Sequence, residues 1–536
     1  MIKEFKGNSL MVKKKILLLF IIIMSCICVL LMAKQKPGMV LDEYFSYGLA
    51  NSTYETNQGK YCIYLPQGIA QEPQTFFDSY FFATSFSPKD VWANQSYDVH
   101  PPMFYLILHA LGRLTHNEWG FFTGIILNLV LHVINIILIY IIIRCVIKKE
   151  FWAYLGSTWY AFLPVVVEHA LYIRMYYLML TCFLTLILWM LIGYRIRNKK
   201  IGIRVIFYIG LGILSIFGVL THYYFVIYLA LICLVWGIFL LYEKRFKEIV
   251  AFLITMGMSG GSCLLIFPGM KYHIFEGNRG QQSIDSLLHS NFRDFLIYYG
   301  EILGHLAGGI LILLAVCGML CWIGFVRKYR KKLLDNINWD YMMLIIPAVM
   351  YYFVISKIGV IRSSRFISPV FGVMIIVFTI ILYQVHKWVY RRFEIRDIIL
   401  KAVFSSLVIV MIGIEWYNFT WNELSMDNHE AVEIAKQYGD DNDCFYIWEN
   451  SENSMVSYPE FIEYEHIYFW QKDTPIEEMK SVLDNYEHLV IYFNCINELD
   501  KERQEEYLNE ILEQSSQMTS YTHLYDGIFN CAYYLE

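Results

Sequence analysis

Two adjacent acidic residues, Asp42 and Glu43, follow the first hydrophobic segment in the stretch MVLDEYFSYGL. This pair has two interpretations. Aspartate is a favoured N-cap residue, and acidic side chains suit the first turn of a helix. A carboxylate held near a membrane surface can instead accept a proton from a hydroxyl group as a general base. The pair by itself does not decide between these interpretations.

Further residues able to bind polar ligands lie at the ends of hydrophobic segments and outside the basic loops. A charge in the hydrocarbon costs roughly 2.5 to 3.5 kcal/mol on insertion scales, so such charges line a cavity or pair with each other. Taken singly, each is most simply a helix-end anchor that reaches the interface. Taken together, on one side of the predicted topology, they favour a binding site. They are His100, Glu168, His169, Arg174, Tyr177, His222, Tyr223, Arg362 and Arg365.

Arg174 is the most specific member of this set, because it enters a long apolar segment as IRMYYLML. A guanidinium binds a phosphate through two parallel hydrogen bonds. Arg362 and Arg365, in RSSRFISP, repeat the arrangement at the start of a later segment. An anionic lipid headgroup is therefore the expected ligand, with ordinary surface lipid binding as the alternative. For Tyr177, an aromatic belt at the interface is the competing interpretation.

The composition decides the class of protein that carries these residues. Of the 536 residues, 57% are hydrophobic and only 17% are charged, which is too apolar for a soluble globule. Segments of about 20 apolar residues, the length that spans a bilayer, recur along the chain. The sequence predicts an all-α polytopic membrane protein. Its eleven expected spans are 16–33, 119–143, 151–168, 173–193, 203–220, 223–242, 249–267, 297–326, 340–356, 366–385 and 398–416.

The basic residues predict how these spans are oriented, because Lys and Arg of short loops stay on the cytoplasmic side. The segments KKK, YRIRNKK and EKRFKE alternate correctly when the N-terminus is cytoplasmic. An odd number of spans then places the C-terminus outside. Residues 34–118 form a large first external loop in this topology. The expected location is the plasma membrane.

The chain is expected to divide into a membrane domain, 1–420, and an acidic tail, 421–536. From Asp427 onward the tail holds 25 of the 48 acidic residues but only 5 of the 43 basic ones, and such a shift marks a domain boundary. The strand-like segments CFYIWE, IYFWQ and HLVIYFN alternate with helical patterns and predict a small extracytoplasmic α/β domain. A disulfide within the tail stays open as an alternative. The cysteines outside apolar segments are Cys62, Cys444, Cys495 and Cys531.

The order of these motifs resembles the GT-C superfamily of glycosyltransferases, and most closely bacterial relatives of dolichyl-phosphate-mannose protein mannosyltransferases. The likeness covers about residues 10–385: the DE pair, the HPP step at His100, RMY at Arg174, THYYF at His222 and RFISP at Arg365. It implies an integral membrane enzyme that takes a sugar, hexose or pentose, from a polyprenyl-phosphate carrier on the external face. It also implies transfer to a hydroxyl of a protein, lipid or glycan, usually with inversion. Asp42 is then the base and Glu43 its support.

Such a reaction makes specific chemical demands. A sugar hydroxyl is a poor nucleophile until a positioned carboxylate takes its proton. The leaving phosphate is already a stable anion, so it needs positive charge around it and not the second carboxylic acid of hydrolases. Arg174, Arg362 and Arg365 are the candidates for that charge. His100 and His222 are expected to add hydrogen bonds to phosphate or sugar.

Two features depart from the family pattern. Met103, Phe104 and Tyr105 follow the proline step, where several members carry a lysine or another polar residue. The acidic tail also has no certain counterpart. We expect no cofactor and no metal, since the carboxylates lack the clustering of magnesium or calcium sites. The expected partners are a polyprenyl-phosphate-linked sugar, a hydroxyl acceptor and membrane lipids, with no nucleic acid.

Two further hypotheses stay open. A transporter or flippase of lipid-linked sugars would bind the same headgroup without chemistry, and it predicts polar residues at the midplane of several spans. Asn128, His132 and Asn135 share one helix face there, where hydrogen bonds between helices are the commoner role. A non-catalytic assembly factor, with the tail as its working part, is the third possibility.

Overall fold

The computed structural model describes residues 2–53, 63–289, 292–308, 314, 316–320, 323–324, 337–422, 424, 428–439, 442–449, 451–494, 501–527 and 530–536. Its contacts divide the chain into two compact units. The membrane unit consists of Met1–Met32, Val99–Phe104 and Gly124–Thr420. The loop–tail unit consists of Ala33–Asp98, Tyr105–Thr123 and Trp421–Glu536. The tail is thus grouped with most of the first predicted external loop.

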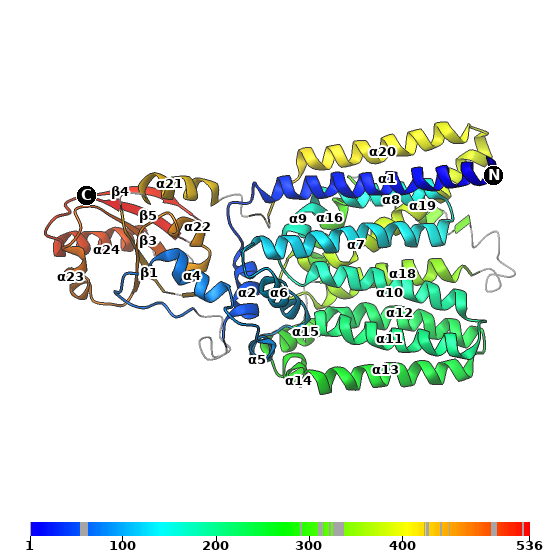
Figure 1. Ribbon diagram of the computed structural model, residues 1–536, viewed down its shortest axis with the longest axis horizontal. Helices are drawn as coiled ribbons and strands as arrows, with labels where there is room; N and C mark the ends of the chain where they lie inside the picture. The colour runs from blue at the N-terminus through cyan, green and yellow to red at the C-terminus, as the bar shows by residue number, and fades with distance from the viewer. Residues whose placement is uncertain are drawn as a thin grey trace. The chain divides into compact units, whose positions relative to one another are not determined.

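Long apolar helices run side by side in the membrane unit (Figure 1). Among the described residues, nine helical stretches have the length and composition to cross a membrane, which confirms nine of the predicted spans and a multi-pass membrane protein. The long helices are α1 Ile2–Ala33, α7 Phe122–Ile147, α10 Tyr176–Ile196, α11 Ile201–Thr221, α12 Tyr224–Tyr242, α13 Phe246–Ile266, α18 Trp339–Ile358, α19 Phe371–Phe393 and α20 Asp397–Asn418. Shorter ones are α14 Gly269–Phe275, α15 Asn278–His289 and α16 Phe292–Gly304.

The expected third span is not one helix. It is divided into α8, Glu150–Phe162, and α9, Pro164–Leu171, with Leu163 extended between them. Pro164 has no backbone N–H and fits only the first turn of a new helix, so the chain bends before it. The prediction of a continuous helix over 151–168 was wrong for this reason. The expected span 297–326 lies partly outside the described residues.

Burial distinguishes inner from outer helices of the membrane unit. Most of α10 is buried, whereas α13 exposes large apolar side chains such as Leu253, Met258 and Leu265. An apolar surface of this kind suits lipid, in which a helix satisfies all its backbone hydrogen bonds internally. The buried helix α10 therefore forms the centre of the unit, and Arg174 lies just before it.

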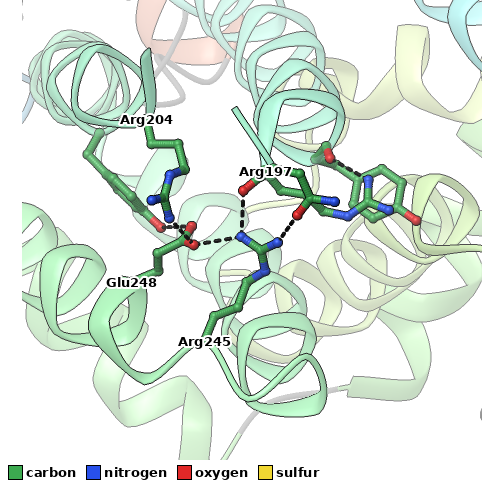
Figure 2. A network of polar contacts seen from close by, with 7 residues as sticks. Arg197, Arg204, Arg245 and Glu248 are labelled. Carbon is green, nitrogen blue, oxygen red and sulfur yellow. Dashed lines mark hydrogen bonds and ion pairs between the residues drawn. The ribbon is translucent and has the colours of Figure 1, made fainter. Parts of the chain in front are cut away.

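A network of basic residues links α10, α11 and α13 at the loops that the sequence predicts to be cytoplasmic (Figure 2). The Glu248 carboxylate accepts hydrogen bonds from Arg204 and from Arg245, each at 2.6 Å. Arg245 also donates to the Arg197 carbonyl at 2.6 Å, and the Arg197 guanidinium lies 4.1 Å from the ring centre of Tyr194. Because two guanidinium groups share one carboxylate, the network keeps a net positive charge, as that side requires.

The tail contains a five-stranded sheet in the order β2-β1-β3-β5-β4. Strands β1 (Cys444–Trp448), β2 (Ile467–Gln471) and β3 (Leu489–Asn494) are parallel, and they confirm the three predicted strands. Two further strands, β4 (Tyr521–Asp526) and β5 (Asn530–Leu535), add an antiparallel edge. Helices α21 His429–Gly439, α22 Tyr458–Phe461, α23 Lys480–Leu483 and α24 Lys501–Gln514 complete the tail. The α/β fold of the tail is as predicted.

Two of the cysteines left open by the sequence lie in this sheet. Cys444 in β1 and Cys531 in β5 are buried free thiols, and Cys531 Sγ contacts Gln504 Oε1 at 3.2 Å. Cys62 and Cys495 lie outside the described residues. Burial in apolar surroundings makes the two described thiols part of the sheet core.

The first loop packs against the tail within the loop–tail unit. Its helices are α2 Leu41–Asn51, α4 Pro73–Phe81 and α5 Pro88–Tyr97, with α6 Met103–Leu114 following. Gln67 and Gln71 form isolated β-bridges with Phe469 and Ile467 of β2. The ring of Phe77 stacks on Phe461 at 6.1 Å. These contacts tie the part of the first loop that follows α2 to the tail.

A buried carboxyl group in the tail predicts pH-dependent stability. Glu460 is 3% exposed, and its Oε2 accepts hydrogen bonds from Tyr525 at 2.9 Å and Asn530 at 2.6 Å. Burial raises the pKa of Glu460 to about 7. The folded state therefore binds its proton more tightly than the unfolded state, and stability falls as the pH rises from the ordinary glutamate pKa to 7, by about 3 kcal/mol.

The measurement is hydrogen exchange of β1 and β5 in the full chain between pH 4.5 and 8, corrected for intrinsic rates. Protection, expressed as a free energy of opening, should decline toward pH 7 in the wild type and stay level in Glu460→Gln. Glu477→Gln changes an exposed carboxylate of the same tail and should keep the wild-type decline. An identical decline in Glu460→Gln would assign the pH dependence to other groups.

Candidate functional site

Asp42 and Glu43 occupy the first turn of α2 but have different surroundings. The Glu43 carboxylate accepts a hydrogen bond from the Val40 backbone N–H at 2.9 Å, in the manner of a capping box. Lys36 Nζ donates to both of its oxygens, at 2.5 and 2.6 Å. The Glu43 and Lys36 side chains are 0% and 3% exposed, whereas Asp42 is partly exposed. The capping interpretation therefore applies to Glu43.

Lys36 is a site residue that the sequence analysis missed. Its signal was a lysine just after the first span, on the side that the sequence predicts to be external and that the positive-inside rule depletes of basic residues. The local sequence gave no indication that its partner is Glu43, because the two residues meet only when α2 begins at Leu41. A buried ion pair of this kind holds the turn that carries Asp42.

Lys36→Met should destabilise this turn by about 3 to 5 kcal/mol, since it leaves a buried carboxylate without its cation. The double variant Lys36→Met/Glu43→Gln should recover most of that loss, because both charges are then gone. Hydrogen exchange of α2 in the full chain measures the effect. Equal exchange in the wild type and in Lys36→Met would show that the pair does not hold the turn.

His100, Arg174 and His222 come together in the membrane unit from three segments far apart in the sequence. The rings of His100 and His222 are 5.9 Å apart, and Tyr176 lies 5.0 Å from His222. His222 is 5% exposed and Arg174 is 4% exposed. Burial and the neighbouring His100 and Arg174 hold the pKa of His222 well below its usual range. The cluster thus gathers positive charge and hydrogen-bond donors at the start of α10.

Arg365 is attached to the segment that precedes Arg174. Its Nη1 donates to the Tyr172 hydroxyl at 2.9 Å, and the Tyr172 carbonyl accepts from Asn128 Nδ2 at 2.8 Å. The next residue, Phe366, contacts the ring of Tyr176 at 5.8 Å. The late motif RFISP therefore packs on the same segment as Arg174, as a shared site requires.

Arg362 has a different environment from Arg365. It forms an ion pair with Asp294 at 3.2 Å, and the two side chains are 56% and 51% exposed. An exposed pair of this kind contributes little to stability and opens easily. The structure therefore separates the two arginines of this motif, and only Arg365 contacts the segment of Arg174.

The other predicted binding residues lie within the protein framework. Glu168 is buried in α9, and His169 Nδ1 lies 2.8 Å from the Val165 carbonyl one turn earlier. The Tyr223 hydroxyl lies 2.8 Å from His273 Nδ1. Tyr177 is buried in the first turn of α10, with its hydroxyl among other side chains. In the sequence, Glu168, His169 and Tyr177 lie close to Arg174, and Tyr223 follows His222.

A chain of hydrogen bonds connects Tyr177 to three other helices. The Tyr177 hydroxyl lies 2.9 Å from the Tyr160 hydroxyl and 2.6 Å from His132 Nδ1. His132 Nε2 lies 2.6 Å from Ser25 Oγ, which donates to the Ala161 carbonyl at 3.0 Å. Since Ser25 gives its proton to that carbonyl, it accepts one from His132. Every polar group is then satisfied, and α1, α7, α8 and α10 are joined beside the Arg174 segment.

Among the described residues, no group of three or more His, Cys, Asp or Glu side chains is placed to hold a metal ion. The residues that do come together are arginines, histidines and tyrosines. Guanidinium and imidazole groups of this kind bind anions through charge-assisted hydrogen bonds.

No family model matches the sequence, and no curated protein is similar to it. Among solved structures, ArnT from Cupriavidus metallidurans bound to undecaprenyl phosphate is similar, with a TM-score of 0.52 at 10% identity over 96% of this chain and 97% of that one. ArnT is a GT-C glycosyltransferase. The chain has the GT-C fold. The predicted resemblance is confirmed at this level, and the likeness extends over almost the whole chain, the tail included.

The oligosaccharyltransferase of Archaeoglobus fulgidus is a more distant neighbour. It has a TM-score of 0.46 and 12% identity, over 96% of this chain and 72% of that one.

Proposed function

We propose that this protein transfers a sugar, hexose or pentose, from a polyprenyl-phosphate-linked donor to a hydroxyl acceptor on a protein, lipid or glycan. The observation that carries the proposal is the meeting of His100, Arg174 and His222 from three separate segments. A buried arginine in a cluster with two histidines suits the phosphate of a lipid carrier. The GT-C fold supports it, since the similar ArnT structure is described as bound to undecaprenyl phosphate.

In the proposed reaction Asp42 takes the proton of the acceptor hydroxyl. The acceptor oxygen forms a bond to the anomeric carbon, on the face opposite the carrier, and the bond from that carbon to the phosphate oxygen breaks. The electron pair of the broken bond leaves with the phosphate, and the anomeric configuration inverts. Arg174 and Arg365 stabilise the charge that develops on the departing oxygen. Glu43, held by Lys36, keeps the turn of Asp42 in place.

The proposed location is the outer face of the plasma membrane, with the N-terminus in the cytoplasm and the tail outside. The distribution of basic residues supports it, and the Arg197, Arg245 and Glu248 network lies in the loops assigned to the cytoplasm. No metal or cofactor enters the proposed reaction, because the leaving group is already a stable anion. The proposal applies to any hydroxyl acceptor and to any length of the polyprenyl carrier.

The alternative function, a transporter or flippase of lipid-linked sugars, relies on polar groups at the midplane. Asn128 donates to the Tyr172 carbonyl, and His132 bonds Tyr177 and Ser25. His132 therefore has partners within the protein at both ring nitrogens, which weighs against a role for this residue in a midplane substrate site. Among the described residues, Asn128 Oδ1 and both amide atoms of Asn135 are buried without a hydrogen-bond partner.

The test is transfer by the purified full chain in vesicles that contain polyprenyl-phosphate-linked hexoses or pentoses, with the products identified by mass spectrometry. A deletion strain, compared with its parent, identifies the natural acceptor by the surface glycan or lipid that loses one sugar. The proposal requires loss of that sugar and its return with the wild-type gene. Movement of labelled donor lipid between leaflets without any transfer would establish the flippase.

A further inference from the structure

His222 is held in one protonation state by a backbone contact. It lies between α11 and α12, and its Nδ1 accepts a hydrogen bond from the Tyr224 backbone N–H at 3.0 Å. A ring nitrogen that accepts a hydrogen bond carries no proton, so the proton of the neutral ring is on Nε2. Among the described residues, no hydrogen bond involves Nε2. The ring is 5% exposed and thus presents one N–H donor from a desolvated position.

The surroundings of this donor indicate an anion as its partner. Among the described residues, the titratable and charged groups found beside the ring are His100, Arg174, Tyr176 and Tyr224. This set contains no carboxylate to take the N–H, and Arg174 supplies positive charge. The pKa of His222 lies well below its ordinary value because of burial and because of the neighbouring His100 and Arg174. A neutral imidazole adds a donor there without adding repulsion.

We propose that His222 donates its Nε2–H to a phosphate oxygen of the lipid carrier, as a neutral donor that complements the charge of Arg174. This assignment rests on the proposed function, which it deepens by giving one residue and one atom to the recognition of the phosphate. It also gives Arg174 and His222 different roles. Arg174 supplies charge, and His222 supplies a directed hydrogen bond whose position the Tyr224 backbone fixes.

The test measures binding of undecaprenyl phosphate and of undecaprenol to the full chain in lipid nanodiscs. His222→Phe keeps an aromatic ring but has no donor, so binding of undecaprenyl phosphate should weaken about 10- to 100-fold, the range for a hydrogen bond to a charged group. Undecaprenol has no phosphate to accept this hydrogen bond, so His222→Phe should bind it within about 2-fold of the wild type.

Two further variants separate donation from packing. The amide nitrogen of Gln reaches the place of Nε2, so His222→Gln should keep phosphate binding within about 3-fold of the wild type. The amide nitrogen of Asn reaches the place of Nδ1, so His222→Asn should bind as weakly as His222→Phe. The matched control is His386→Phe, which changes a buried histidine of α19 that lies near Asp397 of α20 and should bind both lipids normally.

Wild-type binding of undecaprenyl phosphate by His222→Phe would overturn the assignment, and so would equal losses for undecaprenol and undecaprenyl phosphate in a folded variant. If His222→Phe does not fold, His222→Gln and His222→Asn decide the question, since equal binding by the two overturns it. These measurements need no sugar transfer. If the wild type binds undecaprenyl phosphate but transfers no sugar, only the proposed function is contradicted. If the wild type transfers sugar and His222→Phe binds undecaprenyl phosphate as tightly as the wild type does, only this inference is contradicted.

Discussion

Replacement of Asp42 by Asn is expected to lower kcat for sugar transfer about 10²- to 10⁴-fold, the range that a general base contributes. The two side chains have nearly the same size, but an amide cannot accept the hydroxyl proton. Binding of undecaprenyl phosphate should stay close to that of the wild type, because the predicted phosphate ligands are unchanged. Initial rates of transfer and lipid binding, measured on the same purified preparation, give both quantities.

The matched control for this prediction is Asp90→Asn, which changes a carboxylate in the first turn of α5 in the same loop. It should retain wild-type transfer. Normal activity of Asp42→Asn would remove the assignment of the base. Loss of lipid binding along with activity would instead indicate that Asp42 contributes to the architecture of the loop.

Replacement of Arg174 by Met is expected to lower kcat/KM about 10²- to 10³-fold, as removal of one group that stabilises developing charge does elsewhere. The physical reason is that Arg174 is 4% exposed and lies close to His222, where little water replaces the lost charge. The kcat/KM of Arg174→Lys should lie between those of the wild type and Arg174→Met, because lysine keeps the charge but lacks the planar pair of donors. Steady-state kinetics with varied donor lipid measures these differences.

The control for Arg174 lies on the same helix. Arg195, near the C-terminal end of α10, pairs with Asp340 at 3.1 Å and is about one third exposed. Arg195→Met should leave transfer unchanged, with a stability loss of about 1 kcal/mol or less. Equal kinetics for Arg174→Met and the wild type would show that the carrier phosphate is bound elsewhere.

The sequence predicted those parts of the fold that depend on local composition. A span needs about 20 consecutive apolar residues, so nine spans were predicted correctly. A buried parallel strand is a short run of apolar residues, so the strands β1, β2 and β3 were also predicted. The pair β4 and β5 was missed. The segment YTHLYD is largely exposed, so it lacks the apolar run of β1, β2 and β3, and it becomes a strand because it pairs with β5 at the sheet edge.

The candidate site, like the fold, could be predicted from the sequence only in part. Its residue types and their predicted side of the membrane were readable from the chain, because charges near hydrocarbon are costly and basic loops are sorted by side. Local sequence did not reveal which of the charged residues meet. Arg365 and Arg362 are three residues apart in one motif, yet one bonds Tyr172 and the other bonds Asp294 at the surface.

The sequence by itself determined a multi-pass membrane protein with an acidic α/β tail and a likeness to the GT-C superfamily. Only the tertiary structure decided that Lys36 neutralises Glu43, that the first loop packs on β2, and that His100, Arg174 and His222 form one cluster. The physical reason is that these contacts join segments whose meeting depends on helix packing and side-chain direction. Hydrophobic periodicity fixes where a helix buries its face, but the partner of each polar side chain depends on the packing of the whole unit.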